Sequence, residues 1–262
     1  MKSATTLLGV SLKMYFTHRQ SIEWCGSVAE LAGPFGDRLP EGVELFVMPS
    51  FVSLPGAAAQ LENSTIRLGA QDLHWEDYGA FTGEVSPVEL RDIGCSYVEV
   101  GHAERRGIFG ESDKIVADKT AAALRNGLTP VLCIGEPLEG EPEAAIAECT
   151  RQLNSALDGQ FELISKGAPR LVIAYEPVWA IGAATPASEG HIRTVCDALR
   201  SWLHDRGIES ATNIIYGGSA GPGLLSRLGP SVDGLFLGRF AHDTESLAAI
   251  IAEAAALNEF PG

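Results

Sequence analysis

Residues 171–206 read LVIAYEPVWAIGAATPASEGHIRTVCDALRSWLHDR, and this stretch indicates the fold. Its apolar, partly β-branched start predicts a buried strand over Leu171–Tyr175. Glu189–Arg206 then repeats apolar residues at helical spacing, and the following Gly207 is a typical helix stop. A buried strand followed by a helix predicts one strand–helix unit of a parallel sheet.

The same alternation continues outward in both directions, with no low-complexity linker. The other expected strands are Thr6–Leu12, Val43–Met48, Ile66–Ala70, Tyr97–Val100, Thr129–Ile134, Asn213–Ile215 and Gly234–Leu237. Helical periodicity also marks Lys114–Asn126, Pro142–Leu157 and Ser246–Leu257. Eight parallel strands with right-handed crossovers can close a barrel. We therefore predict an α/β fold, a (β/α)8 barrel forming a single domain over residues 1–262; an open doubly wound sheet is the alternative.

Composition excludes several classes of protein. The formal net charge of −15 argues against a nucleic-acid partner, although one local cationic pocket would be enough for a phosphorylated substrate. No apolar run reaches the roughly 20 residues that span a bilayer, and the N-terminus does not resemble a signal peptide. The five cysteines lack C-x-x-C spacing, which favours reduced thiols over disulfides or a zinc site. We expect a cytoplasmic protein without bound metal or membrane contact.

Unusual polar residues and glycines follow five of the expected strands. They are Lys13, His102, Glu176, the turn Gly217–Ser219 and the pair Gly238–Arg239. Catalytic residues of such barrels lie at the carboxyl ends of the strands. The sequence therefore predicts that these residues meet at one mouth.

Each of these residues can be interpreted either as part of a functional site or as an ordinary structural or surface residue. Glu176, backed by apolar residues, can be partly desolvated and act as a base, or it is a surface carboxylate. His102 can polarise a carbonyl oxygen, or it caps a helix. Lys13 faces a substrate phosphate, a carboxylate such as Glu104, or solvent. Residues 177–186 form a mobile lid or an ordinary loop. The glycine-bearing turns after the last two strands can bind an anion through backbone N–H groups.

Six ordered motifs resemble the triosephosphate isomerase family over nearly the whole chain. They are Leu12–Met14, Gly79–Glu84, Gly101–Arg106, Cys133–Glu136, Ala174–Gly182 and Tyr216–Ser219. The resemblance implies a barrel enzyme that moves a proton in a small phosphorylated sugar without a cofactor. It also implies a homodimer in which the loop 72–83 inserts into the partner and places Thr82 near the partner's site.

The resemblance assigns roles to individual residues. Lys13 would be the electrostatic anchor, His102 the neutral electrophile and Glu176 the base, in the pairing for which this family is the standard example. Gly182, Ser219 and Gly238 would contact phosphate through the backbone.

This chain departs from the usual family pattern at several positions. It has Ser11 where the family has Asn, Ala103 where it has Ser, and Arg239 where it has Gly. Smaller residues at 11 and 103 would leave room for a hydroxymethyl group, and Arg239 would block a backbone contact or add charge near phosphate. We therefore expect conversion of L-erythrulose 1-phosphate to D-erythrulose 4-phosphate, as in erythritol catabolism. The alternative is the triosephosphate isomerase reaction of glycolysis.

Two other classes remain to be tested. A Schiff-base aldolase needs a lysine at a strand end inside the mouth, but the sixth strand ends in Glu176 and Lys13 follows the first. A phosphometabolite-binding protein without activity could keep the fold, although Lys13, His102 and Glu176 together speak against it.

Overall fold

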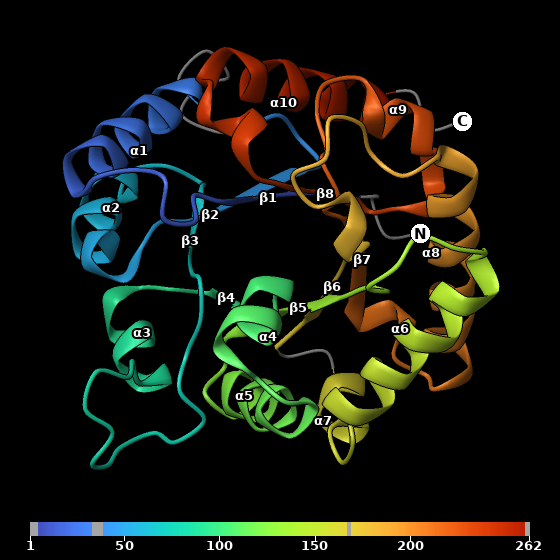
Figure 1. The fold of residues 1–262 in the computed structure, drawn as a ribbon. Helices are drawn as coiled ribbons and strands as arrows, with labels where there is room; N and C mark the ends of the chain where they lie inside the picture. Colours follow the sequence, from blue (N-terminus) through green and yellow to red (C-terminus); the bar gives the residue numbers. More distant parts are fainter. Residues whose placement is uncertain (1–4, 33–38, 167–168, 260–262) are drawn as a thin grey trace.

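The eight strands form one closed parallel barrel with helices around it (Figure 1). The computed structural model describes residues 5–32, 39–166 and 169–259. The strands follow one another around the ring in chain order, and β1 pairs with β8 to close it. This confirms the predicted barrel and excludes the open sheet. The strands are β1 (Thr6–Ser11), β2 (Val43–Met48), β3 (Arg67–Ala70), β4 (Tyr97–Val100), β5 (Thr129–Ile134), β6 (Leu171–Tyr175), β7 (Thr212–Tyr216) and β8 (Gly234–Leu237).

The helices connect each strand to the next and cover the outside of the barrel (Figure 1). The α-helices are α1 (His18–Ala32), α2 (Leu54–Leu61), α3 (Pro87–Ile93), α4 (Ala103–Phe109), α5 (Asp113–Arg125), α6 (Pro142–Ala156), α7 (Phe161–Ser165), α8 (Glu189–Asp205), α9 (Leu224–Leu228) and α10 (Thr244–Glu259). Short 3-10 turns are η2 (Phe51–Ser53), η3 (Val178–Ala180), η4 (Glu209–Ala211), η5 (Gly229–Ser231) and η6 (Arg239–His242). Over the described residues, no helix has the length and apolar content needed to cross a bilayer.

Three strands differ from the expected bounds by one or two residues, for local reasons. β1 ends at Ser11 because Lys13 turns the chain, with a φ of 49°. β3 begins at Arg67 because the N–H of Ile66 bonds to the hydroxyl of Ser64. β7 extends to Thr212 and Tyr216, since both pair with β6.

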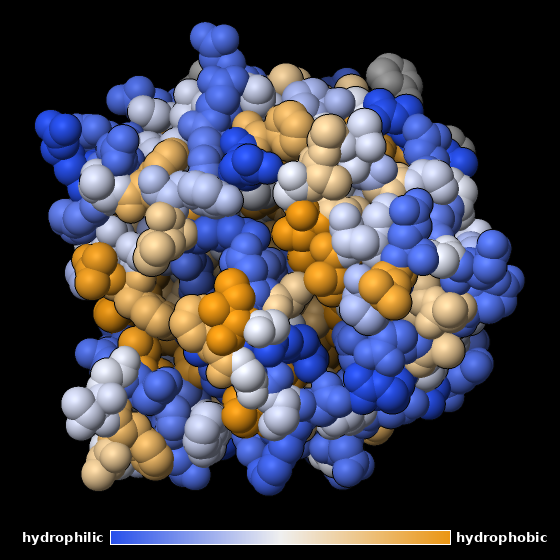
Figure 2. Space-filling view, in the orientation of Figure 1, coloured by the Kyte–Doolittle hydropathy of each residue, from blue (hydrophilic) through white to orange (hydrophobic). Residues whose placement is uncertain are grey.

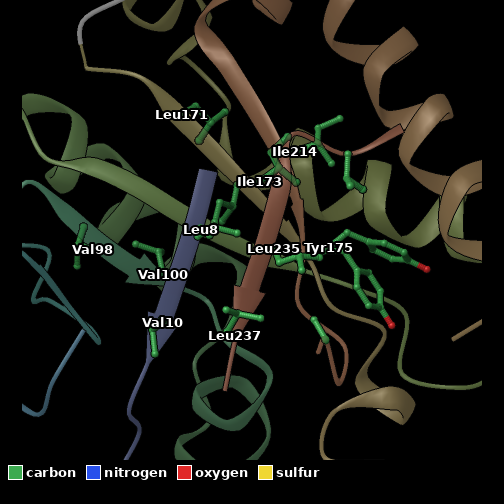
Figure 3. Close-up of a cluster of buried hydrophobic side chains, with 14 of the residues drawn as sticks. Leu8, Val10, Val98, Val100, Leu171, Ile173, Tyr175, Ile214, Leu235 and Leu237 are labelled. Carbon is green, nitrogen blue, oxygen red and sulfur yellow. The ribbon is translucent and has the colours of Figure 1, made fainter. Parts of the chain in front are cut away.

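Alternation along the strands divides the apolar core into two parts, because successive side chains of a strand point to opposite faces. One set packs between the strands and the helices; Figure 3 shows its members Leu8, Val10, Ile173 and Tyr175. The other set fills the inside of the barrel: Leu7, Phe46, Met48, Tyr97, Val131, Cys133, Val172, Ala174, Ile215 and Phe236. The inside of the barrel is therefore packed with side chains below the mouth.

One glycine is required inside this core. A Cβ at Gly9 would lie 2.2 Å from the ring of Phe46 and 2.8 Å from the ring of Phe236. Phe46 in turn stacks on Tyr97, with ring centroids 4.3 Å apart. Gly9 thus makes room for the aromatic layer that closes the barrel floor beneath the mouth.

Candidate active site

A cavity of about 670 Å³ opens at the carboxyl ends of the strands. Its walls come from residues at or just beyond the ends of β1, β4, β6, β7 and β8, and from the segment that follows β6. Figure 2 shows the face drawn in Figure 1, which is hollowed near its centre and carries hydrophobic and hydrophilic side chains next to one another. The strand-end residues predicted to meet do line one cavity.

Strand alternation explains which side chains reach the cavity. In β6, Val172 and Ala174 point into the barrel, and Glu176 is the next position of that series. In β4, Tyr97 points inward and Glu99 follows two residues later. The inward-facing series of each strand therefore extends to its carboxyl end or just beyond it. The last members of the two series are the carboxylates Glu99 and Glu176.

Glu176 is buried between two neighbouring strand ends. Only 5% of its surface is exposed, and its N–H donates to the carbonyl of Ile134 at 2.8 Å. A Cβ on Gly217 would lie 2.5 Å from Oε1, so this glycine makes space for the carboxylate. Within the described part of the chain, Oε2 has no hydrogen-bond partner. A buried carboxylate that lines a cavity and has an oxygen without a hydrogen-bond partner is suited to accept a proton from a ligand.

His102 is held in one orientation by the helix that follows it. It is the N-cap of α4, and its Nδ1 accepts a hydrogen bond from the N–H of Glu104 at 3.1 Å. A ring nitrogen that accepts carries no proton, so the neutral imidazole has its proton on Nε2. Nε2 lies 3.7 Å from Oε2 of Glu176 and 3.9 Å from Oε1 of Glu99. The ring therefore presents a donor to the same space that the carboxylate of Glu176 faces.

Lys13 carries a fixed positive charge at the rim. Its Nζ donates to Oε1 of Glu104 at 2.7 Å, which confirms one of its predicted partners. Burial alone would lower the pKa of Lys13, but the hydrogen bond to Glu104 and the surrounding carboxylates raise that pKa above its ordinary value. The backbone carbonyl of Lys13 is held by Gln71, whose Nε2 donates to it at 3.0 Å. The ammonium stays charged and stays in place.

Glu99 also lines the cavity, and the motifs read from the sequence did not single it out. Its Oε2 accepts from the hydroxyl of Ser11 at 3.0 Å. Burial raises the pKa of Glu99 to about 7, against the opposing effect of nearby His102. The signal was present in the sequence, because a charged residue two positions after Tyr97 in an apolar strand shares its inward face.

The segment after β6 is anchored at several points along its length. The indole Nε1 of Trp179 donates to buried Glu136 at 2.8 Å. The single hydroxyl proton of Ser219 is shared between two carbonyl oxygens, that of Ala180 at 3.0 Å and that of Ala183 at 2.9 Å from Oγ. Ser219 has a φ of 51°, which turns the chain toward the cavity. The segment 177–186 is therefore held by hydrogen bonding to the turn after β7, at the wall of the cavity.

Arg239 reaches the same segment from the other side. It is the first residue of η6, directly after Gly238, and both line the cavity. Its Nη2 donates to the carbonyl of Gly182 at 3.2 Å. Ser11, Gly182, Ser219, Gly238 and Arg239 thus all belong to the walls of one cavity, as expected.

Ala103 and Thr82 lie elsewhere. The expectation that Ala103 borders the substrate space is wrong, because this residue lines a separate space of about 20 Å³ that also touches Cys133 and Glu176. A side chain at the first residue of α4 is directed behind the carboxylate. Thr82 is exposed on the segment between β3 and α3, which extends away from the barrel at the lower left of Figure 1.

Arg105 and Arg106 form ion pairs with carboxylates outside the cavity. Nη2 of Arg105 lies 3.0 Å from Asp72, and its Nε lies 2.8 Å from Glu111. Nη1 of Arg106 lies 2.7 Å from Asp113.

Among the residues that the structure describes, no three His, Cys, Asp or Glu side chains gather as a metal-binding group.

Comparison with known proteins identifies the family. The model of the triosephosphate isomerase family matches residues 6–254. An L-erythrulose-1-phosphate isomerase of Pectobacterium atrosepticum is 51% identical, with 98% of this chain and 99% of the relative covered. One with the same name from Rhizobium etli is 40% identical over 95% of this chain and 92% of its own. A triosephosphate isomerase of Carboxydothermus hydrogenoformans is 41% identical over 91% of this chain and 94% of its own. The chain belongs to the triosephosphate isomerase family.

Proposed function

We propose that this protein is a sugar-phosphate isomerase that converts L-erythrulose 1-phosphate to D-erythrulose 4-phosphate. The observation that carries the proposal is the meeting of Glu176, His102 and Lys13 around one cavity. The names of the relatives at 51% and 40% identity support the tetrose phosphate. The triosephosphate isomerase reaction is the alternative, supported by the relative at 41% identity.

The chemistry follows from the positions of the three groups. Glu176 takes the proton from the carbinol carbon next to the carbonyl, and its free Oε2 is the acceptor. The proton on Nε2 of His102 forms a hydrogen bond to the oxygen that becomes negative in the enediolate. Lys13 adds a positive charge near the same oxygens. His102 gives its Nε2 proton to the former carbonyl oxygen and takes the proton of the neighbouring hydroxyl. Glu176 then returns the carbon-bound proton to the adjacent carbon, so the carbonyl moves between the two inner carbons of the tetrose.

The other end of the cavity is suited to the phosphate. Gly182, Ser219 and Gly238 bring backbone close to the cavity without bulky side chains. The hydroxyl of Ser219 is already occupied by two carbonyls, so we assign its N–H to the ligand. The segment after β6 would close over the ligand and keep water from the enediolate, which limits loss of phosphate.

The size of Ser11 supports the tetrose over the triose. Its side chain is short and turned to Glu99, so it leaves space near the reacting carbons. A four-carbon ketose carries a hydroxymethyl group where a triose has hydrogen. Because Ala103 lies behind Glu176, Ser11 alone of the two substitutions supports this argument.

We also propose a homodimer in the cytoplasm. Tyr78 on the projecting segment and Met14 beside Lys13 are 78% and 93% exposed, and an interface between two copies would remove this apolar surface from water. All five cysteines are free and buried, as in proteins of reducing compartments. Sedimentation of the purified chain tests the dimer, and Tyr78→Asp should shift it to monomer.

A side-by-side assay with triose and tetrose phosphates tests the substrate. We expect kcat/KM to be higher for L-erythrulose 1-phosphate than for dihydroxyacetone phosphate and glyceraldehyde 3-phosphate; the reverse order would establish the alternative. Glu176→Gln should abolish exchange of the carbon-bound proton with solvent and keep ligand binding. Isomerisation at the wild-type rate in that variant would remove Glu176 from its role.

A further inference from the structure

The carboxylates around the cavity would repel a phosphate dianion, so its binding needs a positive charge nearby. The protein has a net charge of −15, and the carboxylates of Glu99, Glu104 and Glu176 line the cavity. Among the lining residues that the structure describes, two carry a lysine or arginine charge, Lys13 and Arg239. Lys13 is already paired with Glu104 at 2.7 Å. The charge of Arg239 is therefore decisive for an anion.

Arg239 has no carboxylate within ion-pair distance in the described residues, in contrast to Lys13. The hydrogen bond that its guanidinium makes is to the carbonyl of Gly182, from Nη2 at 3.2 Å. A guanidinium has five N–H donors in a planar fork, so most of them stay free for a second acceptor. Burial lowers the pKa of His242, and the nearby charge of Arg239 lowers it further.

The position of Arg239 connects the two parts of the phosphate end. It begins η6 directly after β8, whereas Gly182 lies on the segment after β6. Ser219, after β7, holds Ala180 and Ala183 of the same segment. Arg239 thus contacts the middle of the segment between two points that Ser219 already restrains.

We propose that Arg239 binds the substrate phosphate and the carbonyl of Gly182 at the same time. The guanidinium then supplies the unpaired positive charge of the phosphate subsite and fastens the segment 177–186 over the bound ligand. The inference rests on the proposed phosphorylated substrate, and it assigns to one side chain both the affinity for phosphate and the closure of the lid.

Three substitutions separate the charge from the bridge. Arg239→Gln keeps a donor for Gly182 but removes the charge. Arg239→Lys keeps the charge but cannot form two planar contacts at once. Arg239→Gly removes both. Arg19→Gln is the matched control, because Arg19 lies on α1, its side chain is 84% exposed and it is not a lining residue.

The charge is tested by calorimetric titration of the native protein with inorganic phosphate, which needs no sugar. We expect the Kd to rise by about tenfold or more in Arg239→Gln and Arg239→Gly, by less in Arg239→Lys, and to be unchanged in Arg19→Gln. Wild-type phosphate affinity in Arg239→Gln and Arg239→Gly would overturn the proposal.

The bridge is tested by the inorganic phosphate released per turnover of L-erythrulose 1-phosphate. An enediolate that is not enclosed expels the phosphate on its neighbouring carbon, with cleavage of that C–O bond. We expect the ratio of phosphate released to product formed to increase in Arg239→Lys and Arg239→Gly, and to stay at the wild-type value in Arg19→Gln. An unchanged ratio in Arg239→Lys would refute the bridge.

These readouts also separate this inference from the proposed function. If wild-type enzyme prefers triose phosphates but phosphate binding depends on Arg239, the tetrose assignment fails and Arg239 keeps its role; the release ratio is then measured with the triose. If the tetrose is turned over and Arg239 variants bind phosphate normally, the proposed function stands and this inference fails.

Discussion

Gly217→Ala should displace Glu176, the proposed base, with little effect on the fold. The backbone of Gly217 does not have a positive φ, so alanine can adopt it. The new methyl group would lie 2.5 Å from Oε1 of Glu176, whereas ordinary contact begins near 3.4 Å. The carboxylate must therefore move by about 0.9 Å, the difference between these two distances. The methyl group would also lie 2.7 Å from Cγ and 2.9 Å from Cδ, so the whole carboxyl-bearing part of the side chain must shift. All three atoms belong to the side chain of Glu176, so the backbone can stay in place.

A displacement of about 1 Å at a reacting group costs roughly 100-fold in rate, or about 2.7 kcal/mol of transition-state stabilisation. We expect kcat/KM for the preferred substrate to fall by about that factor, while the melting temperature stays within a few degrees of wild type. Gly107→Ala is the control, because a Cβ there meets nothing within 4 Å. Wild-type kcat/KM in a folded Gly217→Ala protein would refute the placement of Glu176 as the base.

Three further predictions concern the cavity walls. Ser11→Asn should lower the ratio of kcat/KM for tetrose to triose phosphate by about tenfold, measured by parallel assays, because the longer side chain fills the added space. Since burial raises the pKa of Glu99 to about 7, the folded chain holds more protons on this carboxyl than the unfolded chain between pH 4.5 and 7. The free energy of unfolding should therefore fall as pH rises through that window. Denaturant titrations should show a smaller fall for Glu99→Gln than for the wild type, by at most about 3 kcal/mol. Ser219→Ala removes the hydroxyl proton shared by the carbonyls of Ala180 and Ala183, which contributes about 1 kcal/mol, and should lower the melting temperature and raise KM; unchanged values would show that this hydroxyl does not hold the segment.

Much of the fold could be predicted because strand alternation and helix stops are local signals. β2, β4, β5, β6 and β8 have the predicted bounds. The errors at β1, β3 and β7 arise at strand ends, where local hydrogen bonds and chain turning decide the boundary and the side-chain pattern does not. Closure of the ring depends on the pairing of β1 with β8, which are more than 200 residues apart. Periodicity alone could not establish that pairing.

The site was predicted in part. Glu176, His102 and Lys13 were identified because each is an unusual polar residue after a strand. Glu99 was missed because it lies inside an apolar strand, where its inward direction was the only signal. Ala103 was misplaced because a helix start directs its side chain by local backbone geometry, and no sequence pattern specifies which of two spaces it borders.

The conformation of Lys13 has a consequence for how this sequence can change. Its φ of 49° lies in the region that favours glycine, and such a non-glycine residue costs about 1 kcal/mol or more. The chain would therefore gain stability from glycine at this position and lose its ammonium in the same step. Glycine would also give up the ion pair with Glu104 at 2.7 Å, so relief of backbone strain and retention of the ammonium oppose each other at this position.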